Sequence, residues 1–128
     1  MMKHKQLFTF LSMFALSCIN AVSAYGDEQV INIQYKGHHG THNDFPMPAD
    51  VPDVYYDAAN QSIIIDGSGC VSYYDVEITS LSSWTVHVST QVSGYYDTID
   101  ISSLPQDDYV ITIDSPLGNS YEGFFDTY

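Results

Sequence analysis

Residues 70–92, CVSYYDVEITSLSSWTVHVSTQV, contain the alternation that decides the fold. In an extended strand, successive side chains point to opposite faces. The first half of this stretch therefore puts Tyr74, Val76 and Ile78 on one face and acids on the other. Leu-Ser-Ser at residues 81–83 interrupts the pattern and predicts a turn between two antiparallel strands.

The second half, residues 84–92, resumes the alternation and predicts that Trp84, Val86 and Val88 point inward. We expect these three side chains to pack across a sandwich against Tyr109, Ile111 and Ile113, because two sheets meet through their apolar faces. On that reading, Trp84→Ala would cost about 3–5 kcal/mol, the usual loss for truncating a buried aromatic residue.

Short runs of the same kind continue along the chain and are separated by Gly, Pro, Asn and Ser. The expected strands are residues 30–35, 53–58, 62–66, 70–79, 84–92, 95–101, 109–114 and 121–125. The spacing of about 8–12 residues between turns is typical of a sandwich. Residues 37–52, rich in Gly, Pro and His, predict a loop or linker that crosses between sheets. The sequence therefore predicts an all-β antiparallel β-sandwich of about seven or eight short strands.

The N-terminus has the pattern of an export signal. Lys3 and Lys5 precede a mostly apolar stretch over residues 7–21, which ends in the small residues Val22-Ser23-Ala24. We expect residues 1–24 to be a signal peptide cleaved near Ala24, with lipidation at Cys18 as the alternative. Residues 25–52 would form an N-terminal strand and loop, in one domain with a sandwich body over residues 53–128. The protein is then secreted, periplasmic or on the cell surface.

Cleavage near Ala24 would leave Lys36 as the only basic residue beside sixteen acids, a net side-chain charge of −15. Binding to nucleic acid needs basic side chains, so it is excluded. Adsorption to anionic membrane surfaces is disfavoured for the same reason. The sequence leaves the oligomeric state open. Cys70, the single cysteine left, opens an apolar strand, and we expect it to be a small buried hydrophobic residue.

Residues 55–125 resemble a family of small secreted β-sandwich proteins of unknown function from gut anaerobes. More distantly they are similar to the C-terminal sorting domains of the Por-type secretion system. The resemblance rests on Val76-Glu77-Ile78, Trp84-Thr85-Val86, Ile101-Ser102-Ser103-Leu104-Pro105, Tyr109-Val110-Ile111-Thr112-Ile113, Gly118 and Tyr121-Glu122-Gly123-Phe124. It implies an immunoglobulin-like fold, export, and one β-meander in which a Ser-Leu-Pro corner feeds a strand that begins with Tyr.

This chain departs from the family pattern at several positions. The family usually has Gly two residues before the corner tyrosine, where this chain has Asp107, and often Gly in the first hairpin, where it has Ser82-Ser83. Asp tolerates left-handed backbone better than most residues, so we expect the corner to survive. The chain ends in Phe-Asp-Thr-Tyr rather than in basic residues, which argues against sorting.

Two groups of residues are candidates for metal binding. His38, His39 and His42 lie in one Gly-rich stretch with Asp44 nearby, and imidazoles can bind zinc, copper or nickel. The alternative is a solvated loop without a site. Acids could bind calcium in three groups, but none matches an EF-hand loop. These groups are Asp50, Asp53 and Asp57; Asp97 and Asp100; and Asp107 and Asp108.

The motif Tyr-Tyr-Asp occurs three times, and its tyrosines are Tyr55 and Tyr56, Tyr73 and Tyr74, and Tyr95 and Tyr96. In a strand, one tyrosine of each pair should point outward. Outward rings beside carboxylates suit a glycan or protein partner; the alternative is that Tyr serves as the amphipathic surface residue of a chain almost without cations. Asp97-Thr98-Ile99 also matches weakly an O-glycosylation pattern at Thr98.

No sequence motif of catalysis stands out. There is no G-x-S-x-G nucleophile elbow and no Gly-rich phosphate loop of sufficient length. We therefore expect a non-enzymatic extracytoplasmic binding or interaction module without a cofactor. A secreted metal-binding protein that uses the histidine loop and a small secreted hydrolase are the two alternatives.

Overall fold

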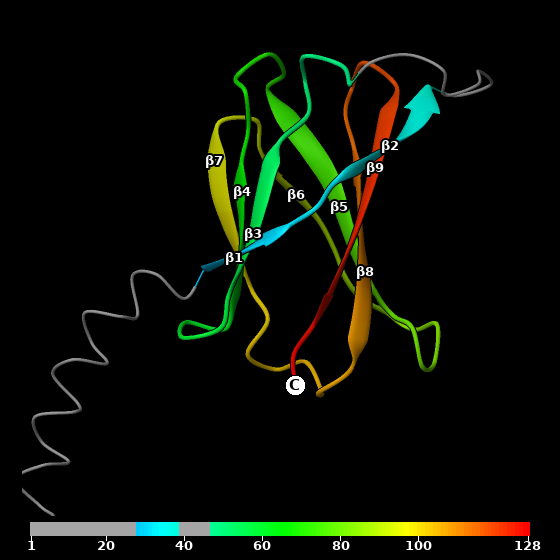
Figure 1. Cartoon of the computed structure of the whole chain (residues 1–128). Coiled ribbons are helices and arrows are strands. Elements are labelled where there is room, and N and C mark those ends of the chain that lie inside the picture. The colour runs from blue at the N-terminus through cyan, green and yellow to red at the C-terminus, as the bar shows by residue number, and fades with distance from the viewer. Residues whose placement is uncertain (1–27, 39–46) are drawn as a thin grey trace, which may run out of the picture.

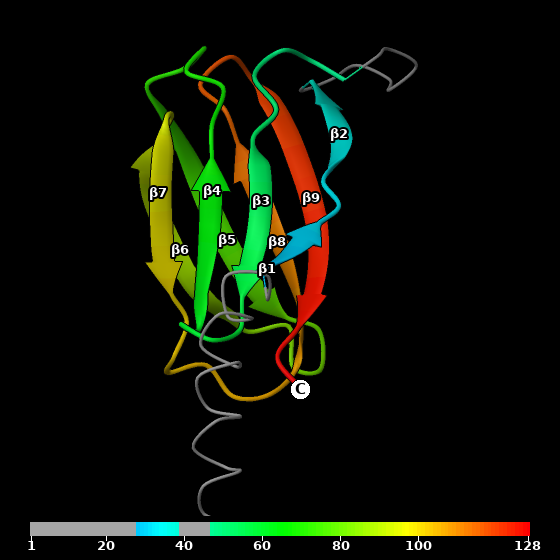
Figure 2. The ribbon, with the colours of Figure 1, turned by 60° about the vertical axis from the view of Figure 1, so that its left-hand side comes forward.

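The computed structural model of this 128-residue chain describes residues 28–38 and 47–128. Within them, nine strands form two antiparallel sheets that face each other (Figures 1 and 2). The strands are β1 Glu28–Ile31, β2 Gln34–His38, β3 Asp53–Asp57, β4 Ser62–Asp66, β5 Tyr73–Ser80, β6 Val86–Ser93, β7 Tyr96–Asp100, β8 Asp108–Asp114 and β9 Asn119–Asp126. The four-stranded sheet has the order β1-β3-β4-β7, and the five-stranded sheet has the order β2-β9-β8-β5-β6. The predicted all-β antiparallel sandwich is confirmed.

The strand expected over residues 30–35 is two strands, which is why the described residues hold nine strands rather than seven or eight. β1 pairs with β3, and after a break at Asn32 and Ile33 the chain joins β9 in the other sheet as β2 (Figure 1). This crossing packs directly on Gly123 of β9. A Cβ at Gly123 would lie 2.7 Å from Ile31 Cγ2, so no larger residue fits there without a shift.

The core lies between the inner faces of the two sheets. The five-stranded sheet contributes Tyr74, Val76, Ile78, Tyr109, Ile111 and Ile113, and all six side chains are almost completely buried, as their alternation predicts. The four-stranded sheet faces them with Val54, Tyr56, Ile63, Ile65 and Ile99. None of the described segments forms a helix with the length and apolar character of a membrane span.

The predicted packing of Trp84, Val86 and Val88 is wrong. β6 and β8 belong to the same sheet, so these residues cannot pack across the sandwich against β8. Trp84 is 72% exposed and Val86 is 50% exposed, whereas Val88 is half-buried against the core. The turn is longer than Leu-Ser-Ser, because the Trp84 N–H donates to the Ser80 carbonyl at 2.8 Å. Trp84 therefore belongs to the turn, and the strand begins only at Val86.

The expected burial of Cys70 is also wrong. Cys70 is an exposed free thiol in the segment between β4 and β5, because β5 begins at Tyr73 and not at residue 70. The same segment contains Gly67 and Gly69, whose N–H groups donate to the carbonyls of Tyr95 and Gly94.

A tyrosine corner leads into β8, as the resemblance implies, but the surrounding strands do not form one meander. β7 lies in the four-stranded sheet and β8 in the five-stranded sheet, so the corner carries the chain from one sheet to the other. The Tyr109 hydroxyl donates to the carbonyl of Pro105, four residues earlier, which is the bond that defines such corners.

The two departures from the family pattern contact each other across this corner. Ser80 Oγ donates to Asp107 Oδ2 at 2.6 Å, and Ser82 Oγ donates to the same oxygen. Asp107 needs no left-handed backbone, because in residues 28–38 and 47–128 the only residues other than Gly with positive φ are Gln61 and Trp84. The carboxylate instead binds the β5–β6 turn to the corner.

Candidate ligand-binding face

The first two Tyr-Tyr pairs obey the alternation of a strand. Tyr56 and Tyr74 point into the core and are buried. Their neighbours, Tyr55 and Tyr73, are half-buried on the outer faces of β3 and β5. Each of these pairs therefore presents one tyrosine ring on the surface, as the sequence predicts.

The third pair presents both of its rings. Tyr95 is 67% exposed and Tyr96 is 58% exposed, because Tyr95 lies in the turn before β7 and Tyr96 begins this edge strand. The Tyr95 ring covers Gly69, where an added Cβ would lie 3.0 Å from Tyr95 Cε1. Tyr96 pairs with Asp66 of β4 and points to the outer face of the four-stranded sheet.

The outward tyrosines do not form one patch. Tyr55 and Tyr96 share the outer face of the four-stranded sheet, which Figure 2 presents toward the viewer. Tyr73 is on the outer face of the other sheet, and Tyr95 lies in the turn at the end of the sandwich. Only Tyr55 and Tyr96 can therefore contact one ligand on one sheet.

We call their surroundings the tyrosine face, and the strand register defines it. Asp53 of β3, Asp66 of β4 and Tyr96 of β7 stand side by side in one row. The next row of the same face adds Val30, Tyr55, Ile64 and Thr98. Because side chains directly opposite in neighbouring strands lie about 5 Å apart, the two rows place aromatic rings next to carboxylates.

Within the described residues, the carboxylates of Asp53 and Asp66 have no bonding partner. Both are exposed and directly opposite each other. By contrast, Asp57 accepts from Asn60 Nδ2 at 2.7 Å. Two like charges directly opposite each other destabilise a sheet. A ligand that donates hydrogen bonds to both carboxylates would reduce the repulsion between them.

The electrostatics of the tyrosine face are wholly acidic. Lys36 is the one lysine that follows residue 24, and it lies on β2 in the other sheet, 3.4 Å from Glu122. The N–H of Ser102, which donates to Asp100 at the edge of the face, lowers the pKa of that carboxyl and keeps it ionised. This surface therefore attracts hydrogen-bond donors and cations and repels anions.

A structure with the same fold is known, although no family model and no curated protein matches the sequence. It is a DUF3244 family protein from Bacteroides vulgatus, described as having an immunoglobulin-like β-sandwich fold. The match has a TM-score of 0.61 at 15% sequence identity and covers 79% of this chain and 99% of that chain. This chain is an immunoglobulin-like β-sandwich. At this identity the similarity concerns the fold alone.

The immunoglobulin-like domain does not bring the candidate calcium ligands together. Asp50 is buried, whereas Asp53 and Asp57 are four residues apart on β3, which separates them by roughly 13 Å along a strand. Residues 28–38 and 47–128 contain no group of three or more His, Cys, Asp or Glu that could hold a metal ion. His38 ends β2, and His39 and His42 lie outside the described residues.

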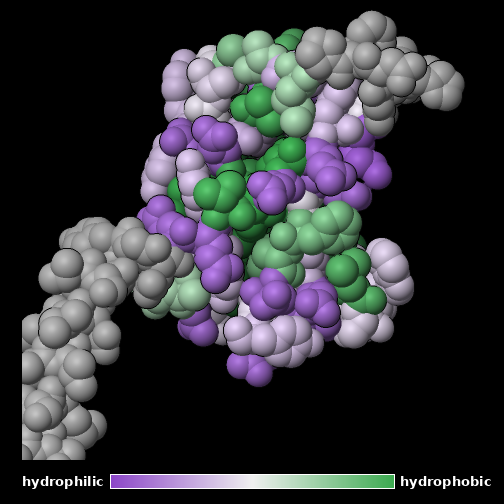
Figure 3. All heavy atoms as spheres, viewed as in Figure 1, coloured by the Kyte–Doolittle hydropathy of each residue, from purple (hydrophilic) through white to green (hydrophobic). Residues whose placement is uncertain are grey.

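An apolar groove of about 260 Å³ adjoins the tyrosine face at Val30. Figure 3 shows apolar side chains gathered there, where β1 and β2 cross between the sheets, with hydrophilic residues around them. Ile31, Ile33, Val51 and Val54 line the groove from the side of the core. It continues the apolar part of the tyrosine face around the edge of the sandwich.

From the sequence, Asp53 is named only as a candidate calcium ligand and Asp66 is not named, although a sequence signal for both residues exists. Asp53 and Tyr55 are two residues apart in one strand, so their side chains lie on the same outer face. The short turn at residues 58–61 makes residues 53–57 and 62–66 a hairpin, and its register pairs Asp53 with Asp66. Only the position of β7 beside β4, which brings in Tyr96, needs the folded structure.

Proposed function

We propose that this domain is a non-enzymatic, extracytoplasmic binding module that binds a neutral glycan on the tyrosine face. The observation that carries the proposal is the row of Asp53, Asp66 and Tyr96, in which two unpaired carboxylates stand beside an exposed ring. Export rests on the signal-like residues 1–24.

The chemistry of the row suits a sugar. The apolar C–H face of a pyranose stacks on an aromatic ring, and Tyr96 offers such a ring, 58% exposed on the outer face of the sheet. Ionised carboxylates accept strong hydrogen bonds from hydroxyl groups, and Asp53 and Asp66 have this capacity unused. Acidic sugars would meet these carboxylates without a cation nearby, so the proposal is restricted to neutral glycans.

A glycan array with the purified protein, followed by calorimetry on the neutral glycans retained, tests the proposal. Tyr96→Ser and Asp66→Asn should each weaken binding by about tenfold or more, equivalent to about 1.4 kcal/mol. Tyr73→Ser is the matched control, since Tyr73 is an outer-face tyrosine of the opposite sheet. It should leave the affinity within about twofold.

Several outcomes would contradict the proposal. Retention of no neutral glycan, or equal binding by Tyr96→Ser and Tyr73→Ser, would remove the tyrosine face as a glycan site. Mass spectrometry of the bound glycan after incubation tests the non-enzymatic part. A cleaved product would show that the domain is a hydrolase and not a binding module. Asp53 and Asp66 would then be the first residues to test by substitution.

A further inference from the structure

β6 is the edge strand of the five-stranded sheet. A register shift interrupts its pairing with β5 opposite residues 86–88, and the regularly paired part, residues 88–93, lacks the features that usually protect an edge strand. The whole strand is eight residues long, Val86–Ser93, and pairs with β5 on one side only. Edge strands are normally blunted by Lys, by Pro, by inward-pointing charges or by shortness. β6 contains no Pro, Gly, Lys, Asp or Glu, and five of its eight residues are exposed.

The region around β6 is also exceptional in its charge. No acid occurs between Glu77 and Asp97, although sixteen acids are spread over the rest of the chain from Asp27 onward. β6 itself therefore carries no carboxylate, unlike the neighbouring strands β5 and β7. Another chain can approach its backbone without meeting a charge on β6 itself.

The backbone of β6 has hydrogen-bonding groups directed at this open side. The Gly94 N–H donates to the Ser72 carbonyl at 3.0 Å, which fixes the alternation of the β5–β6 ladder. Residues 90 and 92 then bond to β5, and the N–H and C=O groups of Ser89 and Gln91 point away from it. Ser93 is capped, because its N–H donates to Asp97 Oδ2 at 3.0 Å.

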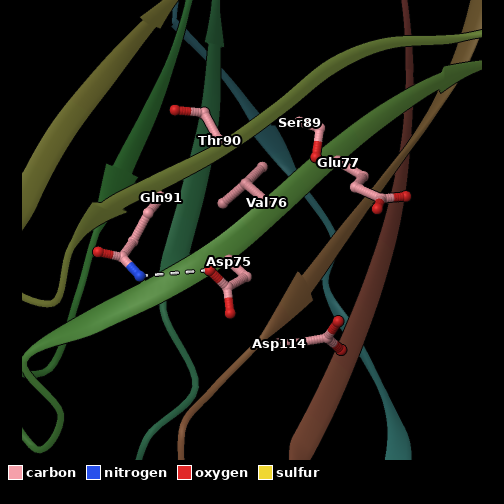
Figure 4. Close-up of a pocket in the computed structure, with 7 residues that line it drawn as sticks. All are labelled: Asp75, Val76, Glu77, Ser89, Thr90, Gln91 and Asp114. Carbon is pink, nitrogen blue, oxygen red and sulfur yellow. Dashed lines mark hydrogen bonds between the residues drawn. The ribbon is translucent and has the colours of Figure 1, made fainter.

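A carboxylate-lined groove of about 460 Å³ runs beside this edge on the outer face of the sheet. Asp75 and Glu77 of β5 and Asp114 of β8 supply the carboxylates, and Ser89 and Gln91 of β6 form the near wall (Figure 4). Asp75 stands directly opposite Asp114, and its one hydrogen bond is a long one, 3.5 Å, from Gln91 Nε2. The groove thus holds three acids with no cation among its lining residues.

We propose that β6 is a docking edge that accepts an extended segment of another protein as an additional strand, with Lys or Arg side chains of that segment reaching the groove. Main-chain bonds to Ser89 and Gln91 would supply affinity, and Asp75, Glu77 and Asp114 would select a basic segment. An added strand would lie about 4.8 Å beyond β6, so the long stem of Lys or Arg can lean over β6 toward these acids.

A second copy of this chain fits the edge less well than a basic segment does. Pairing β6 with β6 would extend the same acidic outer face across both copies, and each copy carries a net charge of −15 after residue 24. Charge complementarity therefore favours the basic partner. The site lies on the opposite sheet from the tyrosine face, so it is independent of the proposed glycan binding.

Fluorescence anisotropy with capped octapeptides tests the docking edge. The probe alternates Thr with Lys, and its matched control alternates Thr with Glu. The Lys peptide should bind, with an affinity that falls as salt rises, and the Glu peptide should not. Gln91→Pro removes an N–H that faces the open side and should weaken binding by about tenfold or more, whereas Gln91→Thr keeps the N–H and should stay within about twofold.

A second measurement keeps the test decisive if Gln91→Pro does not fold. A Lys peptide with an N-methyl group on every residue retains its side-chain charge but has no backbone N–H to donate to β6 from either edge. If the N-methylated peptide binds the unaltered protein as well as its parent does, the peptide is only adsorbed by charge, and the docking edge is wrong. Sedimentation that shows a dimer broken by Gln91→Pro but not by Gln91→Thr would assign the edge to a second copy instead.

Discussion

The hydroxyl of Tyr121 donates a hydrogen bond to the carboxylate of Asp50, a group 71 residues earlier that is only 2% exposed. Ser115 Oγ donates to the same carboxylate at 2.5 Å, and Asn119 Nδ2 at 3.1 Å. The Tyr74 hydroxyl donates to the Asp50 backbone carbonyl at 2.7 Å. Among the described residues, the donors to this buried charge are all neutral, and they join the segment before β3 to the β8–β9 hairpin.

Asp50→Asn should destabilise the fold although it preserves the shape of the side chain. An amide presents one N–H₂ group where the carboxylate had accepted bonds, so at least one donor among Ser115, Asn119 and Tyr121 loses its acceptor. We expect the free energy of unfolding to fall by about 1–3 kcal/mol in urea titrations at pH 7. Asp53→Asn, at an exposed carboxylate without partners, is the control and should change it by less than about 0.5 kcal/mol.

The same carboxylate predicts a pH dependence. Burial opposes the ionisation of Asp50, but the bonds from Ser115, Tyr121 and Asn119 together outweigh it and hold its pKa below the usual value. Because the folded pKa is lower than the unfolded pKa of about 3.9, the stabilisation is complete above that pH and is lost as the pH falls through the folded pKa. The difference in stability between the unaltered protein and Asp50→Asn should therefore shrink below about pH 4. A constant difference down to pH 2 would contradict this.

Trp84→Gly should stabilise the protein or leave it unchanged. Trp84 has φ of 56° and is 72% exposed, so its ring contributes little burial while its backbone is in the left-handed region. This conformation costs a residue with a Cβ about 1–2 kcal/mol, and Gly adopts it freely. Thermal melting should give Tm values in the order Trp84→Gly above Trp84→Ala. A loss of several kcal/mol in Trp84→Ala would mean that the ring is buried after all.

The strand bounds could be predicted from the sequence where local pattern and turn residues agree. Residues 62–66, with three consecutive Ile between polar turns, were expected as a strand, and β4 is Ser62–Asp66. The prediction that Trp84 points inward is wrong because the alternation of Trp84, Val86 and Val88 continues through the turn. No local pattern reveals how long a turn is. The predicted burial of Cys70 is wrong for a similar reason, because Val71 continues the apolar pattern outside the strand.

The candidate site could be predicted only in part, because its parts come from different elements. Period-two alternation correctly predicts one buried and one outward tyrosine in each of the first two Tyr-Tyr pairs, but both tyrosines of the third pair are exposed. Which sheet each outward ring belongs to depends on topology, and a local pattern carries no information about that. The bonds of Asp50 to residues 65–71 positions away lie beyond sequence patterns for the same reason.

The corner hydrogen bond predicts the effect of removing one oxygen. Tyr109 is fully buried, stacks on Phe125 with ring centroids 5.4 Å apart, and donates its hydroxyl to Pro105. Tyr109→Phe keeps the ring packing and removes only the bond, so unfolding should become easier by about 0.5–1.5 kcal/mol. Tyr128→Phe, at a ring that is 76% exposed, should leave the urea midpoint unchanged. Equal midpoints for the two variants would show that the corner bond contributes nothing.

Gly94 should tolerate no side chain, because the backbones of two segments touch at this residue. A Cβ on Gly94 would lie 1.8 Å from the carbonyl oxygen of Val71, which is closer than any non-bonded contact allows. The φ of Gly94 is not positive, so the cost of an Ala there would come from collision and not from backbone conformation. Backbone atoms cannot rotate out of the way as the end of a side chain can, so one of the two segments must move.

Three backbone hydrogen bonds would have to stretch in that movement. The N–H groups of Gly67, Gly69 and Gly94 donate to Tyr95, Gly94 and Ser72 at 2.7, 3.1 and 3.0 Å. We expect Gly94→Ala to lower the free energy of unfolding by about 3 kcal/mol, at the upper end for overpacking, out of a total of roughly 5–15 kcal/mol. Ser72→Ala keeps the same carbonyl acceptor and is the control. If the two variants melt within about 2 °C of each other, the segments do not pack this closely, and the turn that presents Tyr95 and Tyr96 is looser than described.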